Sequence, residues 1–127
     1  MFTGKARIEY STRSRIVGWI DQGIADYYFS LIPKAVYAMK QLHPPHITIV
    51  RSFPIEVIPD RTAWGRHEGR VISFEYNGII RFREPYFYLD VWSADACEIR
   101  KELGLEPFRA PFDRFHFSIG NIKSDKA

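Results

Sequence analysis

The sequence is poor in cysteine, has no long apolar run and carries little net charge. Its one thiol, Cys97, has no second cysteine with which to form a disulfide or share a metal, so disulfide scaffolds and cysteine-based zinc sites are excluded. No stretch approaches about 18 consecutive apolar residues, and four basic side chains interrupt the first fifteen residues, where a secretory signal needs an apolar core. We therefore expect a soluble cytoplasmic protein with no membrane partner.

The charge balance limits the possible ligands. Eighteen Lys and Arg residues against 15 Asp and Glu residues give a net charge of +3, and part of the excess lies in residues 1–20. A protein that binds duplex DNA presents a dense basic stripe, which this composition does not supply. The mild excess permits an anionic ligand, and we expect no duplex DNA as partner. The glycines form no phosphate-cradling motif, which disfavours kinases and P-loop enzymes.

The first half of the chain shows strand, strand, helix and strand patterns in turn. Polar and apolar residues alternate in residues 5–10 and 15–20, which predicts a β-hairpin. Apolar residues then recur at three- and four-residue steps across 24–42, which predicts an amphipathic helix that Pro33 kinks or divides. The β-branched segment 46–50 predicts a buried strand.

The second half repeats that order after a predicted loop at 54–69. Strand patterns at 71–76 and 79–82 flank Asn77-Gly78, the strongest two-residue hairpin signal. The remaining expected elements are strands at 86–92 and 114–119 and a helix at 94–103, capped by Ser93 and ended by Gly104. With 127 residues there is room for one core, so this order predicts a single α+β domain, residues 1–127, with antiparallel strands and helices.

Two of the four histidines occupy the same local pattern. Residues 45–49 read Pro-His-Ile-Thr-Ile, and residues 115–119 read Phe-His-Phe-Ser-Ile. Because strand side chains alternate between two faces, each histidine shares a face with the hydroxyl two positions later: His46 with Thr48, and His116 with Ser118. For one motif alone, a half-buried strand histidine bonded to a nearby carbonyl is the more common explanation. Two such motifs, each after a predicted helix, favour a catalytic pair.

Two imidazoles that face each other across a cleft can divide the work of phosphodiester cleavage. The neutral ring takes a proton from the attacking hydroxyl or water, and the protonated ring gives a proton to the leaving oxygen. Thr48 and Ser118 would donate hydrogen bonds to the non-bridging oxygens, where negative charge builds up. This chemistry requires no metal and no cofactor.

The doubled motif, His46-Ile47-Thr48 and His116-Phe117-Ser118, resembles that of the 2H phosphoesterase superfamily. The resemblance implies a bilobal α+β fold with a pseudo-two-fold axis, in which antiparallel sheets flanked by helices surround a central cleft. The lobes would be about 1–60 and 61–127. It also implies a metal-independent phosphodiesterase whose four site residues are the two histidines and their two hydroxyl partners.

Three further segments, 1–5, 26–28 and 97–104, are similar to the small phage anti-CBASS phosphodiesterases. This resemblance implies cleavage of 3′–5′ bonds in the cyclic di- and trinucleotides that activate abortive-infection effectors. The protein would then act in the host cytoplasm as a phage counter-defence enzyme. Its substrate would be a small cyclic nucleotide.

A cyclic oligonucleotide site combines aromatic platforms for bases with cations for phosphates. The aromatic candidates are Tyr10, Trp19, Trp64, Tyr86 and Tyr88, and the cationic candidates are Lys5, Arg7, Arg51, Arg109 and Arg114. Among the aromatic residues we favour Tyr10, at the end of a strand in the most basic region, and Trp64, an apolar residue in a polar loop. Among the cations we favour Arg51, which follows the strand that carries His46.

Other functions are compatible with the same residues. One alternative is a 2′,3′-cyclic phosphodiesterase or an RNA-end-processing enzyme, although RNA requires a longer basic track. A third alternative is a cyclic-nucleotide-binding protein without catalysis. A metal site at His43 and His46 is disfavoured, because prolines extend the chain between them and no carboxylate or cysteine stands at ligand spacing.

Overall fold

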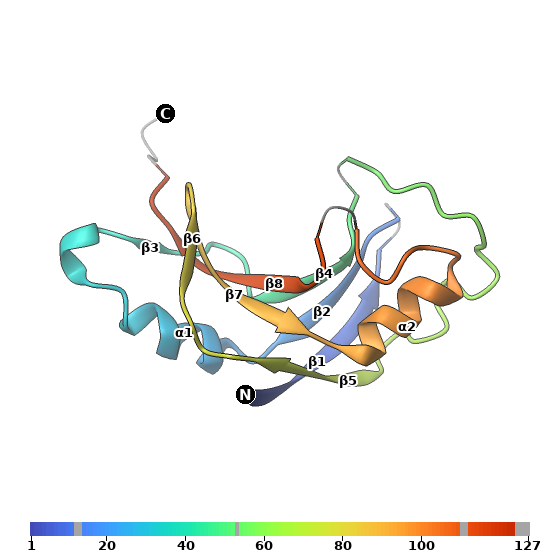
Figure 1. Ribbon diagram of the computed structural model, residues 1–127, viewed down its shortest axis with the longest axis horizontal. Helices are drawn as coiled ribbons and strands as arrows, with labels where there is room; N and C mark the ends of the chain where they lie inside the picture. Colours follow the sequence, from blue (N-terminus) through green and yellow to red (C-terminus); the bar gives the residue numbers. More distant parts are fainter. Residues whose placement is uncertain (12–13, 53, 110–111, 124–127) are drawn as a thin grey trace.

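Antiparallel strands form one curled sheet with two α-helices beside it (Figure 1). The computed structural model describes residues 1–11, 14–52, 54–109 and 112–123. The elements in these residues are β1 (Phe2–Tyr10), β2 (Ile16–Ile20), α1 (Gln22–Ser30), the 3₁₀ turn η1 (Lys34–Val36), β3 (Met39–Lys40), β4 (His46–Val50), β5 (Val71–Tyr76), β6 (Arg81–Arg83), β7 (Tyr86–Trp92), α2 (Ala94–Glu102) and β8 (Phe115–Asn121). The predicted α+β class is confirmed.

The strand order shows how the two halves of the chain meet. It runs β3-β8-β7-β5-β1-β2-β4. β6 lies outside this order and pairs with the beginning of β7, whereas β5 pairs with its end. β1 and β5 pair at the centre, and outward from them each half of the chain adds one strand and then a histidine strand, β4 or β8. The sheet curls until β4 and β8 lie side by side without ladder hydrogen bonds between them (Figure 1).

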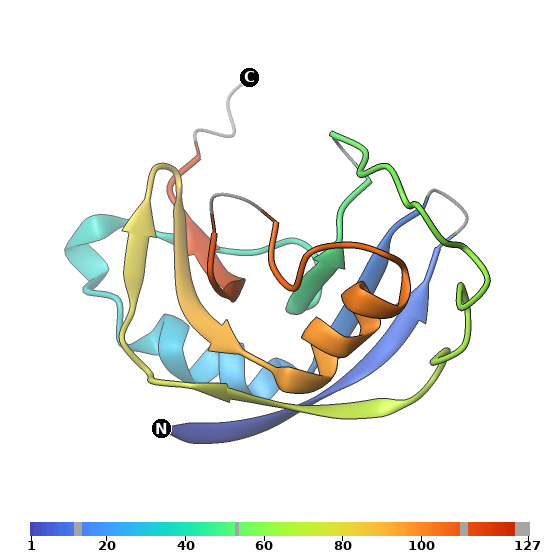
Figure 2. The same ribbon diagram turned by 45° about the vertical axis from the view of Figure 1, so that its right-hand side comes forward.

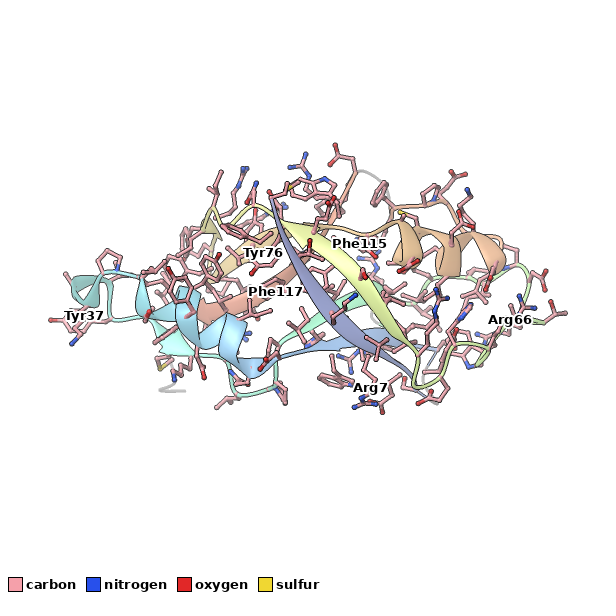
Figure 3. The ribbon with its side chains drawn as sticks, turned by 90° about the horizontal axis from the view of Figure 1, so that it is seen from below. Arg7, Tyr37, Arg66, Tyr76, Phe115 and Phe117 are labelled. Atoms are coloured by element: carbon pink, nitrogen blue, oxygen red, sulfur yellow. The ribbon has the colours of Figure 1, made fainter. Side chains whose placement is uncertain are left out.

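Alternation along β4 and β8 places the core on one face of these strands. Ile47 and Ile49 on β4 and Phe117 and Ile119 on β8 are fully or almost fully buried. The rings of Phe74 and Phe117 pack edge to face with centroids 6.2 Å apart. The histidines and hydroxyls must point to the opposite face, because strand side chains alternate. Figure 3 shows Tyr76 and Phe117 near the middle of the molecule, with Tyr37 and Arg66 at its two ends.

The prediction for 24–42, a helix that Pro33 kinks or divides, is confirmed in part: the helix does break before Pro33, but the part after it forms only a 3₁₀ turn, and the α-helix extends no further than Ser30. α1 ends there, and Pro33 has a backbone ψ of 135°, which is extended rather than helical. Proline lacks the amide donor that a continuing helix needs. The later apolar residues that suggested a helical face do not form one, because Leu31, Met39 and Leu42 are exposed, the last at 96%. Only η1 and the short strand β3 form in that segment.

The hairpin predicted at Asn77-Gly78 is also wrong. A turn does occur, since Gly78 has φ +75° and the Asn77 side chain accepts a hydrogen bond from the Ile79 amide at 3.0 Å. However, β5 pairs with β1 on one edge and with β7 on the other, so neither edge is left for the next strand. β6 pairs instead with β7.

Several local predictions are confirmed. β1 and β2 form the expected antiparallel hairpin. The Ser93 hydroxyl caps α2 by accepting a hydrogen bond from the Ala96 amide at 3.1 Å, and Gly104 follows the helix with φ +80°. The described part of the segment 54–69 contains turns and no helix or named strand. Neither α-helix in the described residues is long and apolar enough to cross a membrane.

Candidate active site

The four residues of the doubled motif meet in one cavity. His46, Thr48, His116 and Ser118 all line a space of about 190 Å³ between β4 and β8. The side chains come from neighbouring strands of the two halves of the chain, and they share the face opposite to the core. The structure therefore brings together two imidazoles and two hydroxyls that lie seventy positions apart in the sequence.

Hydrogen bonds hold His46 in one orientation and one tautomer. Its Nδ1 lies 3.1 Å from the Pro44 carbonyl oxygen, which can only accept, so Nδ1 carries the proton. Its Nε2 then has the free electron pair and accepts a hydrogen bond from Arg15 Nη2 at 3.3 Å. The Trp19 ring packs edge-on at 5.3 Å, and its Nε1 donates to Glu9. His46 is thus oriented with a basic nitrogen next to a cation.

His116 has a different environment. Its cross-strand partner on β7 is Asp90, which is only 5% exposed and lies 3.3 Å from Arg114 Nη1. The Tyr88 ring packs edge-on against the imidazole at 5.5 Å. Within the described part of the chain, no group is hydrogen-bonded to the ring nitrogens of His116. Both nitrogens are available to a ligand in the cavity.

The pKa values of both histidines are lowered. For His46, burial is the main cause, and the positive charge of Arg15 adds to it, while the hydrogen bond to the Pro44 carbonyl opposes it. The His116 ring is reached by solvent but surrounded by the cavity walls, so loss of hydration lowers its pKa most, Asp90 opposes this, and Arg109 and His46 lower it further. The charge of His46 therefore disfavours the protonated form of His116.

A larger cavity of about 500 Å³ opens on the other side of His116 and Ser118. Both residues line it together with Tyr86, Tyr88 and Arg114, and Asp90 and Arg81 also contribute. Its volume is within the range of pockets that hold small organic ligands. Aromatic rings and guanidinium groups together are suited to a nucleoside and its phosphate.

The structure does not bring two of the favoured binding residues, Tyr10 and Trp64, to the histidines. Their rings pack against each other at 5.1 Å, edge to face, and the Tyr10 hydroxyl accepts a hydrogen bond from the His67 amide. Tyr10 pairs with Ile16, at the opposite end of β2 from the residue that pairs with His46. Trp64 looked isolated in the sequence because its partner Tyr10 is 54 positions away.

The third favoured residue, Arg51, lies beside the site. It lines a cavity of about 60 Å³ that also touches Thr48 and His116. Sequence reasoning placed Tyr86, Tyr88, Arg109 and Arg114 among its candidates, and all four line these cavities.

Sequence reasoning missed Arg15 and Asp90. Asp90 left a signal, because it is the one carboxylate in the otherwise apolar strand 86–92. No pattern in the sequence pointed to Arg15, because its approach to His46 depends on the register between β2 and β4.

The donor groups of the site do not form a metal cluster. No group of three or more His, Cys, Asp or Glu side chains placed to hold a metal ion occurs among residues 1–11, 14–52, 54–109 and 112–123. Comparison of the chain with protein-family models, with characterised proteins and with solved structures finds no match. The function must therefore be argued from the geometry of the two histidine strands.

Proposed function

We propose that this protein is a metal-independent phosphodiesterase of the 2H type that opens 3′–5′ bonds in cyclic di- and trinucleotides. One observation carries the proposal: both histidines and both hydroxyls of the doubled motif line a single cavity. A phosphate in that cavity would have a proton-transfer group from each half of the chain and a hydroxyl donor beside each.

The arrangement of strands supports the 2H type of fold. The two halves contribute strands in mirrored order on either side of the β1–β5 pair, and each half ends at its histidine strand. A helix precedes each of these strands in sequence, α1 before β4 and α2 before β8. This is the order that two lobes related by a pseudo-two-fold axis would have, with a boundary near residues 60 and 61.

The environments of the two rings favour different roles. His46 presents an unprotonated Nε2, and its burial and the charge of Arg15 disfavour the protonated form, so His46 is the general base. Asp90 favours the protonated form of His116, so His116 is the general acid. The negative charge of a bound phosphate would raise the pKa of His116 further. His116 can then be protonated in the complex at neutral pH.

The reaction follows from these roles. His46 Nε2 removes the proton of the nucleophile, which is water or a ribose 2′-hydroxyl, as a new oxygen–phosphorus bond forms. His116 delivers its proton to the departing oxygen as the old bond breaks. Thr48 and Ser118 donate to the non-bridging oxygens. Arg15 donates a stronger hydrogen bond to an anionic phosphate than to a neutral imidazole. The substrate phosphate would therefore replace His46 as the hydrogen-bond acceptor of Arg15, which leaves His46 Nε2 free to accept a proton.

The surroundings favour a small nucleotide over a long RNA. The larger cavity beside His116 offers Tyr86 and Tyr88 with nearby arginines, which suits a base and its ribose phosphate. The net charge of +3 is modest for a protein that follows an RNA backbone. Cleavage of a cyclic signal would prevent activation of its effector. The proposed role of the protein is therefore that of a phage counter-defence enzyme in the host cytoplasm.

The test is turnover of a panel of cyclic di- and trinucleotides, a nucleoside 2′,3′-cyclic phosphate and a short RNA, with and without EDTA, followed by chromatography. Wild-type protein should open a cyclic substrate in EDTA, and His46→Ala and His116→Ala should each lose about 10²–10⁴-fold in rate. The matched control is His67→Ala, because His67 pairs with Glu102 and lines none of the three cavities that surround His116.

The outcomes separate the alternatives. Loss of activity in EDTA would overturn the metal-independent mechanism. Turnover of only the RNA or the 2′,3′-cyclic phosphate would identify the alternative substrate class. Tight binding of a cyclic nucleotide without turnover, unchanged in both histidine variants, would identify a binding protein without catalysis.

A further inference from the structure

The small cavity beside His116 is lined by an unusual number of cations. Arg51, Arg100, Arg109 and Arg114 all line its volume of about 60 Å³, and Glu56 is the carboxylate in this lining. The segment between α2 and β8, which carries Arg109, returns near β4 in Figure 2. Four guanidinium groups around so small a space repel one another unless negative charges neutralise them.

Arg100 is fully engaged in holding the structure together. Its Nη2 and Nη1 lie 3.0 and 3.2 Å from the two oxygens of Glu56. Its remaining donors reach the carbonyl oxygens of Ile49, at 2.8 Å, and Glu106, at 2.7 Å. Both oxygens of Glu56 therefore bind Arg100, and Oε2 also accepts a hydrogen bond from the Arg51 backbone amide at 3.0 Å. Arg114 has its own carboxylates, Asp113 and Asp90.

Arg51 and Arg109 have no such partner. Arg51 Nε is buried and is the one buried side-chain nitrogen in the described residues that lacks a hydrogen-bond partner. The Arg109 guanidinium packs over the Phe112 ring at 4.8 Å, and no ion pair involves it among the described residues. Burial and then the charge of Arg51 lower the pKa of Arg109, so the two cations repel each other. A buried unpaired donor is costly, and an anion would satisfy it.

The cavity is sized for a compact anion. Its volume of about 60 Å³ is small beside the cavity of about 500 Å³ that also borders His116, so it suits a compact anion such as a phosphate group better than a nucleobase. It adjoins the reaction site, because Thr48 and His116 line both cavities. A phosphate here would lie next to a phosphate held between the two histidines.

We infer that Arg51 and Arg109 form a second phosphate subsite, so that the substrate carries a non-scissile phosphate in addition to the one that is cleaved. This inference rests on the proposed phosphodiesterase function, and it narrows the substrate class to nucleotides with more than one phosphate. Nucleotides with two or more phosphodiesters use both positions, whereas a nucleoside 2′,3′-cyclic monophosphate fills only the reaction site.

The first experiment compares these two kinds of substrate. Arg51→Gln and Arg109→Gln should each reduce kcat/KM for a cyclic dinucleotide by about tenfold, which corresponds to about 1.4 kcal/mol. The kcat/KM of Arg51→Gln for a nucleoside 2′,3′-cyclic monophosphate should stay within about twofold of wild type. Arg109→Gln also removes a charge that lowers the pKa of His116, so for this variant the ratio of the losses for the two substrates is compared. Arg51→Lys keeps the charge and should recover part of the loss. Arg66→Gln, which removes an exposed arginine that pairs with Glu102, is the matched control.

The second experiment does not depend on turnover. Inorganic phosphate is added to the His46→Ala/His116→Ala double variant, and the arginine Nε–H signals are followed by NMR. The Arg51 signal should move with a saturable dependence on phosphate, and the Arg66 signal should not. Thermal unfolding of each variant shows whether it is folded.

The two results separate the inference from the proposed function. A saturable Arg51 response without turnover of any phosphodiester would overturn the proposed function and keep the anion subsite. No Arg51 response, together with cyclic-dinucleotide turnover that Arg51→Gln/Arg109→Gln leaves unchanged, would overturn the subsite and keep the enzyme. An equal loss for both substrates would assign these arginines to the reaction site and overturn the second subsite.

Discussion

Asp90 and His116 face each other across the β7–β8 pair, so a nearly buried carboxylate stands beside one of the two imidazole rings that line the cavity. His46 has no equivalent carboxylate among its electrostatic neighbours, which are Arg15 and His43. The two strands that look alike in the sequence thus give their histidines different electrostatic surroundings, because His116 has a carboxylate beside its positive neighbours Arg109 and His46, whereas the neighbours of His46 are Arg15 and His43. That difference underlies the proposed roles of acid and base, and it leads to the first prediction.

Asp90→Asn should reduce the rate at neutral pH by about tenfold, less than loss of the His116 ring itself. Removal of the negative charge lowers the pKa of His116 further below its ordinary value, so a smaller fraction is protonated. The alkaline limb of the rate profile should move to lower pH, and NMR titration of the imidazole should show the same shift. Asp113→Asn is the control, because Asp113 also pairs with Arg114 but is exposed. An unchanged His116 titration in Asp90→Asn would contradict this assignment.

The dependence of kcat/KM on pH should be bell-shaped, with its midpoint below pH 6.5. This parameter reports the free enzyme, in which loss of hydration lowers the pKa of both histidines from 6.5. Because the charge of His46 lowers the pKa of His116, the titrations are coupled and the two apparent pKa values belong to the pair. Initial rates at low substrate concentration across pH 4–8 give the profile. A midpoint above pH 7 would show that the two rings do not have these environments.

Arg15→Gln should raise KM by about tenfold and raise the pKa of His46. The change removes a charged donor to the substrate phosphate, which is worth about 1.5–3 kcal/mol, and removes a positive charge beside the imidazole. Steady-state kinetics and NMR titration of His46 measure the two effects. Arg7→Gln is a suitable control, because Arg7 is an exposed arginine of the neighbouring strand β1. A lower pKa of His46 in Arg15→Gln would contradict the proposed contact.

Glu56→Gln should destabilise the protein by about 3 kcal/mol, because it leaves Arg100 as a buried and uncompensated charge. Both side chains are nearly buried, at 11% and 3% exposure. Urea unfolding measures the change. Glu98→Gln, which removes an exposed ion pair with Lys101, should cost less than about 0.5 kcal/mol. Equal effects of the two substitutions would contradict a structural role for the buried pair.

The two histidines should also make stability depend on pH. Their pKa values are lower in the folded protein than the ordinary 6.5 of the unfolded chain, so below about pH 6.5 the unfolded chain binds more protons. Their contribution is therefore complete above pH 6.5 and is lost as the pH falls through the lowered pKa values. Urea unfolding at several pH values should show a flatter dependence for His46→Asn/His116→Asn than for wild type. An equal slope in both proteins would mean that the folded-state pKa values are not lowered.

Local sequence patterns determined several parts of this protein correctly. Alternation along 46–50 and 115–119 was sufficient to pair each histidine with its hydroxyl on one face, because strand geometry is local. The capping serine and the terminal glycine located α2 for the same reason. The proposed chemistry starts from these short segments, and it depends on the tertiary contact that places them around one cavity.

Tertiary structure decided which other residues those segments contact. The period of three and four residues across 24–42 suggested that helical structure resumes after Pro33, but the exposure of Leu42 shows that no core lies against that second part. Only the curl of the sheet brings β4 beside β8. The register of β2 against β4 brings Arg15 to the His46 ring, and the register of β7 against β8 brings Asp90 to the His116 ring. Contacts between distant strands depend on the whole sheet, so no local pattern in the sequence specifies them.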